Sequence, residues 1–480
     1  MQLLGRRFGR AALVAMVGVL AVPLSTVAVF GQITAPSVFE SIENVPDLKC
    51  PPVGRTRRAA TASQRLREGP PELEEVEPLR SLRPAALDAP SITAAGPKLQ
   101  RLLPDRPLSH PLRIGIWGDS HSAAGLVSAE LSRILRQRVG GVSAGYLPPT
   151  MGRAGVAGLP IRKYCMNSDW TLDAAYIAKH PMQTGPALAN RRSTAPGAYL
   201  WIDFRDPQGQ ALLEHVIMHY APTTNAAVLR IQVDARPAET VSLPATPPGD
   251  GRLRGLKIDG AGRHLSTVKV TVVSGTLRLS GFELARAEPG SVVLDTFGLP
   301  SATIRGWAML DAVPREWEQS PYGYDYVILQ YGTNDSAVLD FDLARYRQSL
   351  VEALANMRAT FPAAQCLMIG PPDRGVSVRA KAERRKSRNA LTDLLRWSRV
   401  HADVSRTQRE VGETFGCSAW NWQSAMGGPG SAYAWYYASP RLMSRDLIHL
   451  TAAGYRKSTG TLASFIGLSP DSEMDEASSR

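Results

Sequence analysis

The sequence contains few cysteines, few histidines and few aromatic residues. Its 480 residues include 4 Cys and 8 His, and Phe, Trp and Tyr together make up 7%. The cysteines match no metal-ligand spacing, so a zinc finger or another cysteine-based metal centre is not expected. In an oxidising compartment they can form disulfides in an order that the sequence leaves open, and Cys366, within an apolar run, can equally be a buried thiol. The four are Cys50, Cys165, Cys366 and Cys417.

Acidic residues are outnumbered by basic ones. The chain has 55 Lys and Arg against 43 Asp and Glu, for a net charge of +12. This excess suits anionic surfaces or polymers in general and names no single partner. No zinc-finger spacing, basic zipper or aromatic RNA-binding signature is present, so nucleic acid is not an expected partner. No motif calls for a metal or another cofactor.

Only one stretch is apolar and long enough to cross a bilayer. Residues 11–30 carry no charge and follow Arg6, Arg7 and Arg10. A basic region followed by an apolar run is typical of an export signal, so residues 1–31 are predicted to be a signal peptide or an uncleaved signal anchor. Either one implies a periplasmic or secreted location for the rest of the chain, and the anchor adds a tether to the inner membrane.

The rest of the chain divides into segments of different composition. Residues 32–110 are rich in Pro, Ala and Arg and are predicted to be a largely disordered linker. Residues 111–159 begin with a strand and a helix, which open an α/β fold. Residues 160–287 alternate apolar and polar side chains between Gly- and Pro-rich turns, which is typical of a β-sandwich. The α/β pattern resumes over residues 288–468, and residues 469–480 are expected to form a flexible tail. The sequence therefore predicts one α/β domain interrupted by an inserted β-sandwich.

Two smaller features have ordinary structural interpretations. Tyr199 and Trp201 would share one face of a strand, and we expect this pair in the core of the sandwich rather than on a sugar-binding surface. The basic run from Arg379 to Arg388 is expected to be a solvated helix face, with contact to an anionic polymer as the alternative.

A candidate nucleophile follows the first predicted strand. Gly118-Asp119-Ser120-His121 stands where that strand ends and a helix begins. Ligands of open parallel sheets bind beyond the carboxyl ends of the strands, and a strand-to-helix turn exposes a hydroxyl beside backbone amides. A Ser or Asp before a helix can also be a simple N-cap.

Two further motifs contain the groups that a serine nucleophile needs. Asn334, in Gly332-Thr333-Asn334-Asp335 after an apolar strand, has an amide that can donate to an oxyanion. Asp446 and His449, three residues apart, can serve as the carboxylate and the base. Alone, the first motif could be an ordinary turn and the second a capping Asp beside a surface His.

Together these residues resemble the SGNH hydrolase superfamily, whose blocks are a GDS motif, a glycine, a GxND motif and a terminal DxxH. The resemblance implies a flavodoxin-like parallel sheet. It also implies that Ser120 is the nucleophile, that His449 is the base and that Asp446 orients His449. The oxyanion hole would be formed by the Ser120 amide, a second-block amide and Asn334.

The second block departs from the family pattern. Gly298 fits its first glycine, but Ser301 stands where the oxyanion glycine is expected, and we assign both to the oxyanion hole. A serine amide can donate there if its backbone angles are reachable without glycine. Asp119 and His121, beside the nucleophile, are expected to contact substrate.

A narrower resemblance suggests a substrate class. The segment from Trp420 to Gly428, continuing to His449, resembles bacterial peptidoglycan O-acetylesterases and related polysaccharide O-acetyl enzymes. Those relatives have a carbohydrate-binding-like β-sandwich in the place where residues 160–287 lie. The resemblance implies an extracytoplasmic esterase that removes O-acetyl groups from peptidoglycan or from an exopolysaccharide such as cellulose, alongside cell-envelope polysaccharide machinery. The alternatives are an O-acetyltransferase with the same triad and a non-catalytic polysaccharide-binding assembly factor.

Overall fold

The computed structural model describes most of the chain from residue 110 to residue 468 and a short segment before it. The predicted signal, most of the linker, the basic run and the tail lie outside the described residues. No helix within the described ranges is long and apolar enough to cross a membrane. The described residues are 48–51, 110–246, 252–286, 292–311, 323–338, 340–376 and 394–468.

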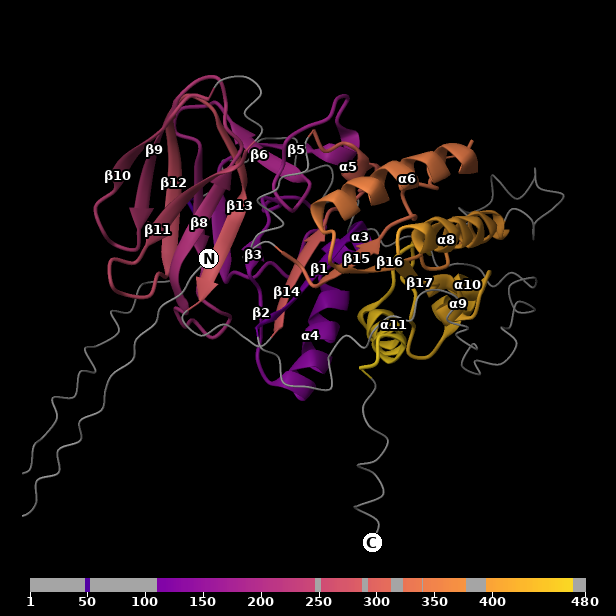
Figure 1. Cartoon of the computed structure of the whole chain (residues 1–480). Coiled ribbons are helices and arrows are strands. Elements are labelled where there is room, and N and C mark those ends of the chain that lie inside the picture. The colour runs from indigo at the N-terminus through magenta and orange to yellow at the C-terminus, as the bar shows by residue number, and fades with distance from the viewer. Residues whose placement is uncertain are drawn as a thin grey trace, which may run out of the picture. The chain divides into compact units, whose positions relative to one another are not determined.

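A six-stranded parallel sheet forms the centre of the α/β part (Figure 1). Its strand order is β17-β16-β15-β1-β14-β2, and every pairing is parallel. The longer strands are nearly continuous apolar runs, as expected for strands covered on both faces. The predicted α/β fold with a parallel sheet is confirmed. The strands are β1 (Leu112–Gly118), β2 (Val142–Ser143), β14 (Val292–Gly298), β15 (Tyr326–Gln330), β16 (Gln365–Ile369) and β17 (Cys417–Trp420).

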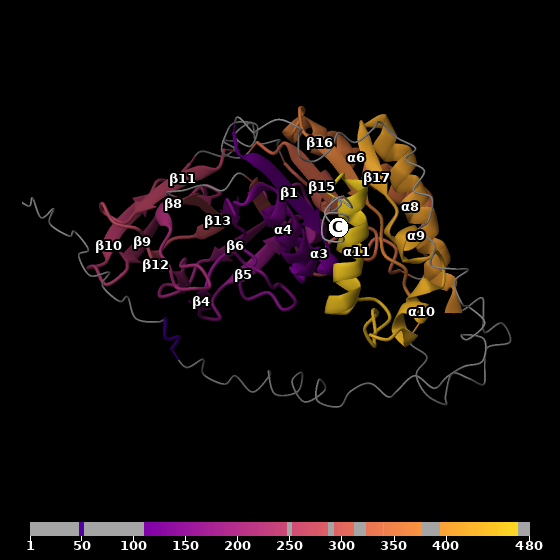
Figure 2. The same ribbon diagram turned by 90° about the horizontal axis from the view of Figure 1, so that it is seen from below.

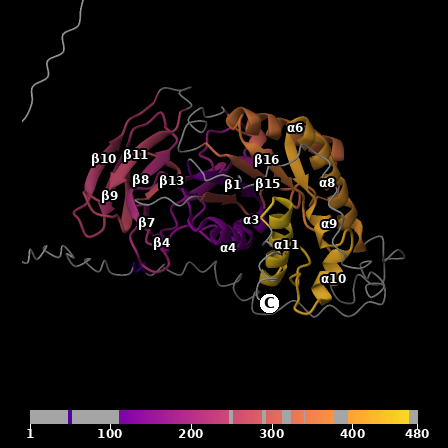
Figure 3. The ribbon, with the colours of Figure 1, turned by 60° about the horizontal axis from the view of Figure 1, so that its bottom comes forward.

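Helices cover both faces of this sheet. On one face, α4 (Leu126–Val139) and α11 (Ala452–Phe465) pack against each other and bury Ile114 and Ile116 of β1. On the other face, α6 (Leu343–Thr360) and α8 (Arg396–Thr414) cover Trp117. Figures 2 and 3 show α4 and α11 on the opposite side of the strands from α6. Alternate residues of β1 therefore belong to two different cores. Shorter helices are α5 (Arg305–Ala308), α9 (Trp422–Met426) and α10 (Ser431–Tyr437).

Two antiparallel sheets form a sandwich between β2 and β14. One has the order β10-β9-β12-β7-β4 and the other β11-β8-β13-β6-β5. Both contribute to one apolar core, with Ile202 and Val270 from the first sheet and Met218 and Phe282 from the second. The predicted interruption by a β-sandwich is confirmed. The strands are β4 (Lys163–Met166), β5 (Thr171–Ala174), β6 (Ala189–Ser193), β7 (Tyr199–Asp203), β8 (Leu213–Tyr220), β9 (Ala227–Val233), β10 (Glu239–Leu243), β11 (Arg254–Asp259), β12 (Thr267–Ser274) and β13 (Leu277–Arg286).

The predicted core position of Tyr199 and Trp201 is wrong. Leu200 and Ile202 are the buried residues of β7, so the strand's two-residue alternation turns Tyr199 and Trp201 to the other face. Both rings are half-buried there, and the Nζ atom of Lys269 lies 5.2 Å from each ring centroid. A cation over the rings stabilises aromatic side chains outside the core.

The two ends of the insert meet beside the parallel sheet. Strand β3 (Tyr146–Leu147), which precedes the insert, pairs antiparallel with β13, which ends it. The hydroxyl of Tyr146 donates to the Ser280 carbonyl at 3.0 Å. The buried carboxylate of Asp295, on β14, accepts from the Tyr146 N–H at 2.9 Å. These bonds connect the sandwich directly to the strand that resumes the α/β fold.

All four cysteines form disulfides. Cys50 is bonded to Cys165 of β4, which holds residues 48–51 against the sandwich. Cys366 is bonded to Cys417, which lies opposite it on the neighbouring strand β17. The alternative of a free Cys366 thiol is therefore wrong, and the pairing that the sequence left open is resolved by which strands are neighbours.

The bond between Cys366 and Cys417 closes a loop of 51 residues. We expect the double variant Cys366→Ala/Cys417→Ala to lose about 4 kcal/mol of unfolding free energy, because the denatured chain regains the entropy of that loop. Denaturant unfolding under oxidising conditions measures the loss. The variant Cys50→Ala/Cys165→Ala, which keeps this bridge, is the comparison. An unchanged midpoint for the first variant would show that the bridge does not stabilise the sheet.

Candidate active site

Three chain segments leave the parallel sheet at the same level. Gly118 at the end of β1 lies opposite Gly298 of β14 on one side and opposite Gln330 of β15 on the other. The residues that follow these three positions therefore meet at the carboxyl edge of the sheet, where open α/β sheets bind ligands. Ser120, Ser301 and Asn334 all lie in those segments.

Ser120 is the first residue of the short helix α3 (Ser120–Ala123). The side chain of Asp119 caps this helix by accepting from the His121 N–H at 2.9 Å. Gly298 allows α3 to cross the end of β14, because a Cβ at Gly298 would lie 2.2 Å from the Ala123 nitrogen. Ser120 itself is only partly buried, and its N–H belongs to the first helical turn, where amides have no partner within the helix.

Ser120, His449 and Asp446 form a continuous hydrogen-bonded chain. The Nε2 atom of His449 lies 2.9 Å from the Ser120 Oγ atom. The Nδ1 atom of the same ring lies 2.6 Å from Asp446 Oδ2. A carboxylate on Nδ1 fixes the imidazole tautomer so that Nε2 can accept the proton of the hydroxyl.

The loop that carries Asp446 and His449 is held on both sides. Asp446 Oδ1 accepts from the His449 N–H at 2.9 Å and from the Ser444 hydroxyl at 2.6 Å. Leu447 is fully buried at a φ of 56°, and its carbonyl accepts from the Gly375 N–H at 2.9 Å. The buried leucine keeps the turn in a conformation that L-residues adopt at a cost.

The two ionisable members of this chain influence each other. Burial acts to raise the pKa of Asp446, but the hydrogen bonds from His449 and Ser444 outweigh it and hold that pKa well below its usual range. The hydrogen bond to Asp446 raises the pKa of His449, while burial opposes the change. Asp446 is therefore ionised at neutral pH and stabilises the protonated imidazole.

Asn334 and Asp335, in the segment after β15, form hydrogen bonds to the segment after β14. The Asn334 amide donates to the Ala302 carbonyl at 3.1 Å, which leaves its other N–H for a ligand. The Asp335 carboxylate accepts from the Ile304 N–H at 3.0 Å and from the Gly332 N–H at 3.1 Å. Burial raises the pKa of Asp335 to about 7.

Ser301 adopts a backbone conformation that favours glycine. Its φ is 69°, in the left-handed region, and the Ala302 N–H donates to the Leu299 carbonyl at 2.9 Å to close the turn. A serine can therefore occupy this position, at a cost that a glycine would not incur. Gly298 instead lies within the β1–β14 ladder beneath α3, where its visible role is steric. The oxyanion roles of Ser301 and Gly298 stay predictions.

Asp119 and His121 are fully buried beside Ser120. His121 Nδ1 lies 2.9 Å from the hydroxyl of Tyr455, and its ring centroid lies 5.3 Å from that of His449. Burial raises the pKa of Asp119 to about 6 and lowers that of His121 well below its usual value. The structure offers no exposed surface of either side chain to a substrate, so their visible role is to support the Ser120 turn.

Three residues near the triad escaped the sequence analysis. Ser444 stands two residues before Asp446, a spacing common in local turns, and could have been noticed. Tyr455 and Arg374 carried no local signal, because helix α11 and the loop after β16 bring them near the other residues only in the folded chain.

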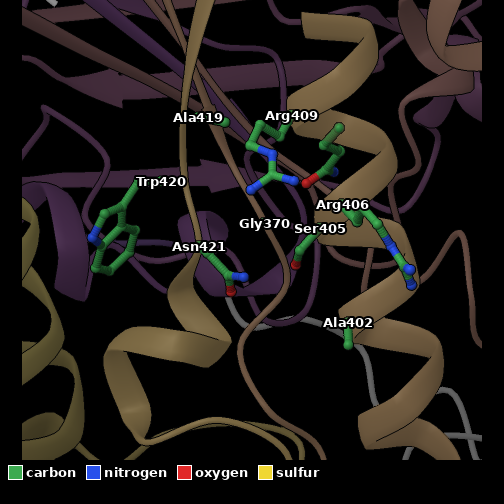
Figure 4. Close-up of a pocket in the computed structure, with 9 residues that line it drawn as sticks. Gly370, Ala402, Ser405, Arg406, Arg409, Ala419, Trp420 and Asn421 are labelled. Atoms are coloured by element: carbon green, nitrogen blue, oxygen red, sulfur yellow. The ribbon is translucent and has the colours of Figure 1, made fainter. Parts of the chain in front are cut away.

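A pocket elsewhere on the carboxyl edge does not contain the triad. Its volume is about 340 Å³, and it lies between α8 and the ends of β16 and β17 (Figure 4). The side chains of Ser405, Arg409 and Asn421 are among those that line it. Among the residues that the structure describes, no group of three His, Cys, Asp or Glu side chains is arranged to hold a metal ion.

Comparison with known proteins identifies one family that matches part of the chain. Residues 271–457 match the GDSL-like lipase/acylhydrolase family. This range includes Asn334, Asp446 and His449 but not Ser120, which the sandwich separates from them in the sequence. None of the curated proteins matches the chain.

Solved structures match the chain at low sequence identity. A peptidoglycan O-acetylesterase is 21% identical with a TM-score of 0.55, over 77% of this chain and 93% of that one. A family 2 carbohydrate esterase with a carbohydrate-binding domain from Corynascus thermopiles (Myceliophthora fergusii) is 10% identical with a TM-score of 0.24, over 62% of this chain and 99% of that one. A GDSL-like lipase from Parabacteroides merdae is 16% identical with a TM-score of 0.27, over 37% and 74%. The chain thus has the SGNH hydrolase fold, matches the GDSL-like lipase/acylhydrolase family over residues 271–457, and resembles a peptidoglycan O-acetylesterase in architecture.

Proposed function

We propose that this protein is an extracytoplasmic serine esterase that removes O-acetyl groups from a polysaccharide. The observation that carries the proposal is the hydrogen-bonded chain from Ser120 through His449 to Asp446, with distances of 2.9 and 2.6 Å. A hydroxyl, a base and an orienting carboxylate in this order are what acyl transfer through a serine requires.

The first half-reaction transfers the acetyl group to the enzyme. His449 takes the proton of the Ser120 hydroxyl as Oγ attacks the acetyl carbonyl carbon. The resulting oxyanion accepts hydrogen bonds from the Ser120 N–H, the Ser301 N–H and the free N–H of Asn334. The carbon–oxygen bond to the sugar then breaks, and His449 returns its proton to the departing sugar oxygen.

The second half-reaction releases acetate. Water gives a proton to His449 and attacks the acetyl-Ser120 carbonyl, forming the same type of oxyanion. Collapse of this intermediate breaks the bond to Ser120 Oγ, which recovers its proton from His449. Asp446 stays ionised throughout and stabilises the imidazolium in both half-reactions.

Several features favour a polymeric substrate outside the cytoplasm. The side chains of His449 and Asp446 are 39% and 47% exposed, so a large substrate can reach them. The fold resembles that of a peptidoglycan O-acetylesterase. We propose that the sandwich, residues 160–287, holds the polysaccharide near Ser120, since a second binding body raises the local substrate concentration. Two disulfides suit a periplasmic or secreted protein, as does the basic and apolar pattern of residues 1–31.

Replacement of Ser120 tests the whole proposal. Ser120→Ala should lower hydrolysis of an aryl acetate by about 10⁴-fold or more, because no other group forms the acyl-enzyme. Acetate release by purified protein measures the loss. The matched control is Ser128→Ala, because the hydroxyl of Ser128 on α4 donates to the Gly125 carbonyl. Unchanged turnover in Ser120→Ala would rule out a serine esterase.

Asn334→Ala tests the oxyanion hole separately. We expect kcat to fall by about 10²- to 10³-fold, because the lost N–H stabilises charge that develops only in the transition state. Steady-state kinetics on the same aryl acetate should show little change in KM. A silent Asn334→Ala combined with a dead Ser120→Ala would remove Asn334 from the hole and leave the triad in place.

The pH dependence follows from the raised pKa of His449. Only neutral His449 can accept the Ser120 proton, and the hydrogen bond to Asp446 raises the pKa of His449 above its ordinary value of 6.5. The value of kcat/KM should therefore rise with pH and reach half its maximum above pH 6.5. In Asp446→Asn the midpoint should move to lower pH, with turnover reduced by about 10³- to 10⁴-fold. An unmoved midpoint would contradict the assigned pair.

A further inference from the structure

Arg374 lies beside the loop that carries Asp446 and His449. It follows β16 at the carboxyl edge of the sheet, and the N–H of the next residue, Gly375, donates to the Leu447 carbonyl at 2.9 Å. The Ser398 hydroxyl donates to the Arg374 carbonyl at 3.3 Å. The first bond holds this segment against the candidate catalytic loop, and the second holds the backbone of Arg374 against α8.

The guanidinium of Arg374 has no ionic partner among the residues that the structure describes. It lies over the ring of Trp397, with its central carbon 4.7 Å from the ring centroid. Within the described ranges no carboxylate lies within ion-pairing distance of it and no acceptor receives its N–H groups, and its Nε atom is buried without a hydrogen bond. A half-buried cation normally gains a partner, because desolvation without compensation is costly.

Asp446 does not serve as that partner. Its Oδ2 atom is bonded to His449 Nδ1, and its Oδ1 atom accepts from the Ser444 hydroxyl and from the Ile448 and His449 N–H groups. The charges nevertheless interact. Burial lowers the pKa of Arg374 and Asp446 opposes this, while Arg374 acts to lower the pKa of His449. The positive charge of Arg374 is therefore within electrostatic range of the triad.

We propose that Arg374 binds a carboxylate of the substrate, so that the enzyme selects an acetylated sugar that also bears a carboxylate. This inference rests on the proposed function and narrows its substrate class. A planar guanidinium presents two parallel N–H groups that match a carboxylate, and the Trp397 ring lies against the guanidinium of Arg374. A carboxylate carries the single negative charge that balances the guanidinium of Arg374, whereas a phosphate monoester has a charge near −2.

A merely structural role for Arg374 makes a different prediction. If its charge only tuned His449, or its contact with Trp397 only held the loop, its loss would affect every acetyl ester to the same degree. If it binds a carboxylate, its loss affects only substrates that have one. The two roles are therefore separated by a pair of substrates that differ in one charge.

The experiment uses the full chain with an O-acetylated methyl glucuronoside and with the methyl ester of the same sugar. Wild type should prefer the carboxylate form. Arg374→Gln should lower kcat/KM for that form by about 10- to 100-fold, mainly through KM, and leave the methyl ester within about 2-fold. Arg374→Lys keeps the charge but loses the two parallel N–H groups, so its kcat/KM for the carboxylate form should lie between those of wild type and Arg374→Gln. Arg345→Gln, which removes an exposed charge from the first turn of α6, is the matched control and should change neither.

Two results of the substrate comparison would overturn the proposal. One is an equal loss on both substrates in folded Arg374→Gln, and the other is a wild type without preference for the carboxylate. Calorimetric binding of the unacetylated glucuronoside to Ser120→Ala provides a readout without turnover. Affinity should fall by roughly 10-fold or more when Arg374→Gln is added, because a hydrogen bond between charged groups is lost. Arg374-dependent binding with no cleavage of either ester would refute the proposed esterase but support the carboxylate site. Absence of that binding would refute the site.

Discussion

The parallel pairing of β1 with both of its neighbours is the constraint on which the rest of the site depends. That register places Gly118, Gly298 and Gln330 at one level, so three segments that are distant in the sequence begin at the same edge. A shift of one residue in either ladder would move a segment by about 3.3 Å and turn its side chains to the opposite face. Hydrogen bonds from Asn334 and to Asp335 then hold the segments together.

The insert is compatible with this arrangement because both of its ends lie at one place. The pairing of β3 with β13 closes the sandwich next to β14, so β14 can still pair with β1 as if nothing intervened. The family match, residues 271–457, begins within β12 of the insert and includes β14 but not β1. The parallel sheet brings Ser120 and His449 together although 329 residues separate them in the sequence.

Conformations and buried groups that cost free energy are concentrated around the candidate site. Leu447 and Ser301 both have a positive φ, and the buried Nε atom of Arg374 has no hydrogen-bond partner within the described part of the chain. Such features persist only where surrounding structure compensates for them, and they are concentrated where binding and chemistry occur. Here the compensation is visible: Leu447 is buried in the core, a closed turn holds Ser301, and the Trp397 ring lies under Arg374.

The sequence by itself determined the features that depend on neighbours along the chain. The period of two in the insert, the apolar runs of the parallel strands and the turn motifs around Ser120, Asn334 and His449 are local patterns, and they predicted the fold class and the candidate site. Only the tertiary structure decided which cysteines pair, which face of β7 is buried and which cation lies beside the triad. Each of these depends on contacts between segments far apart in the sequence, and alternation along a strand shows that two faces exist without showing which one meets the core.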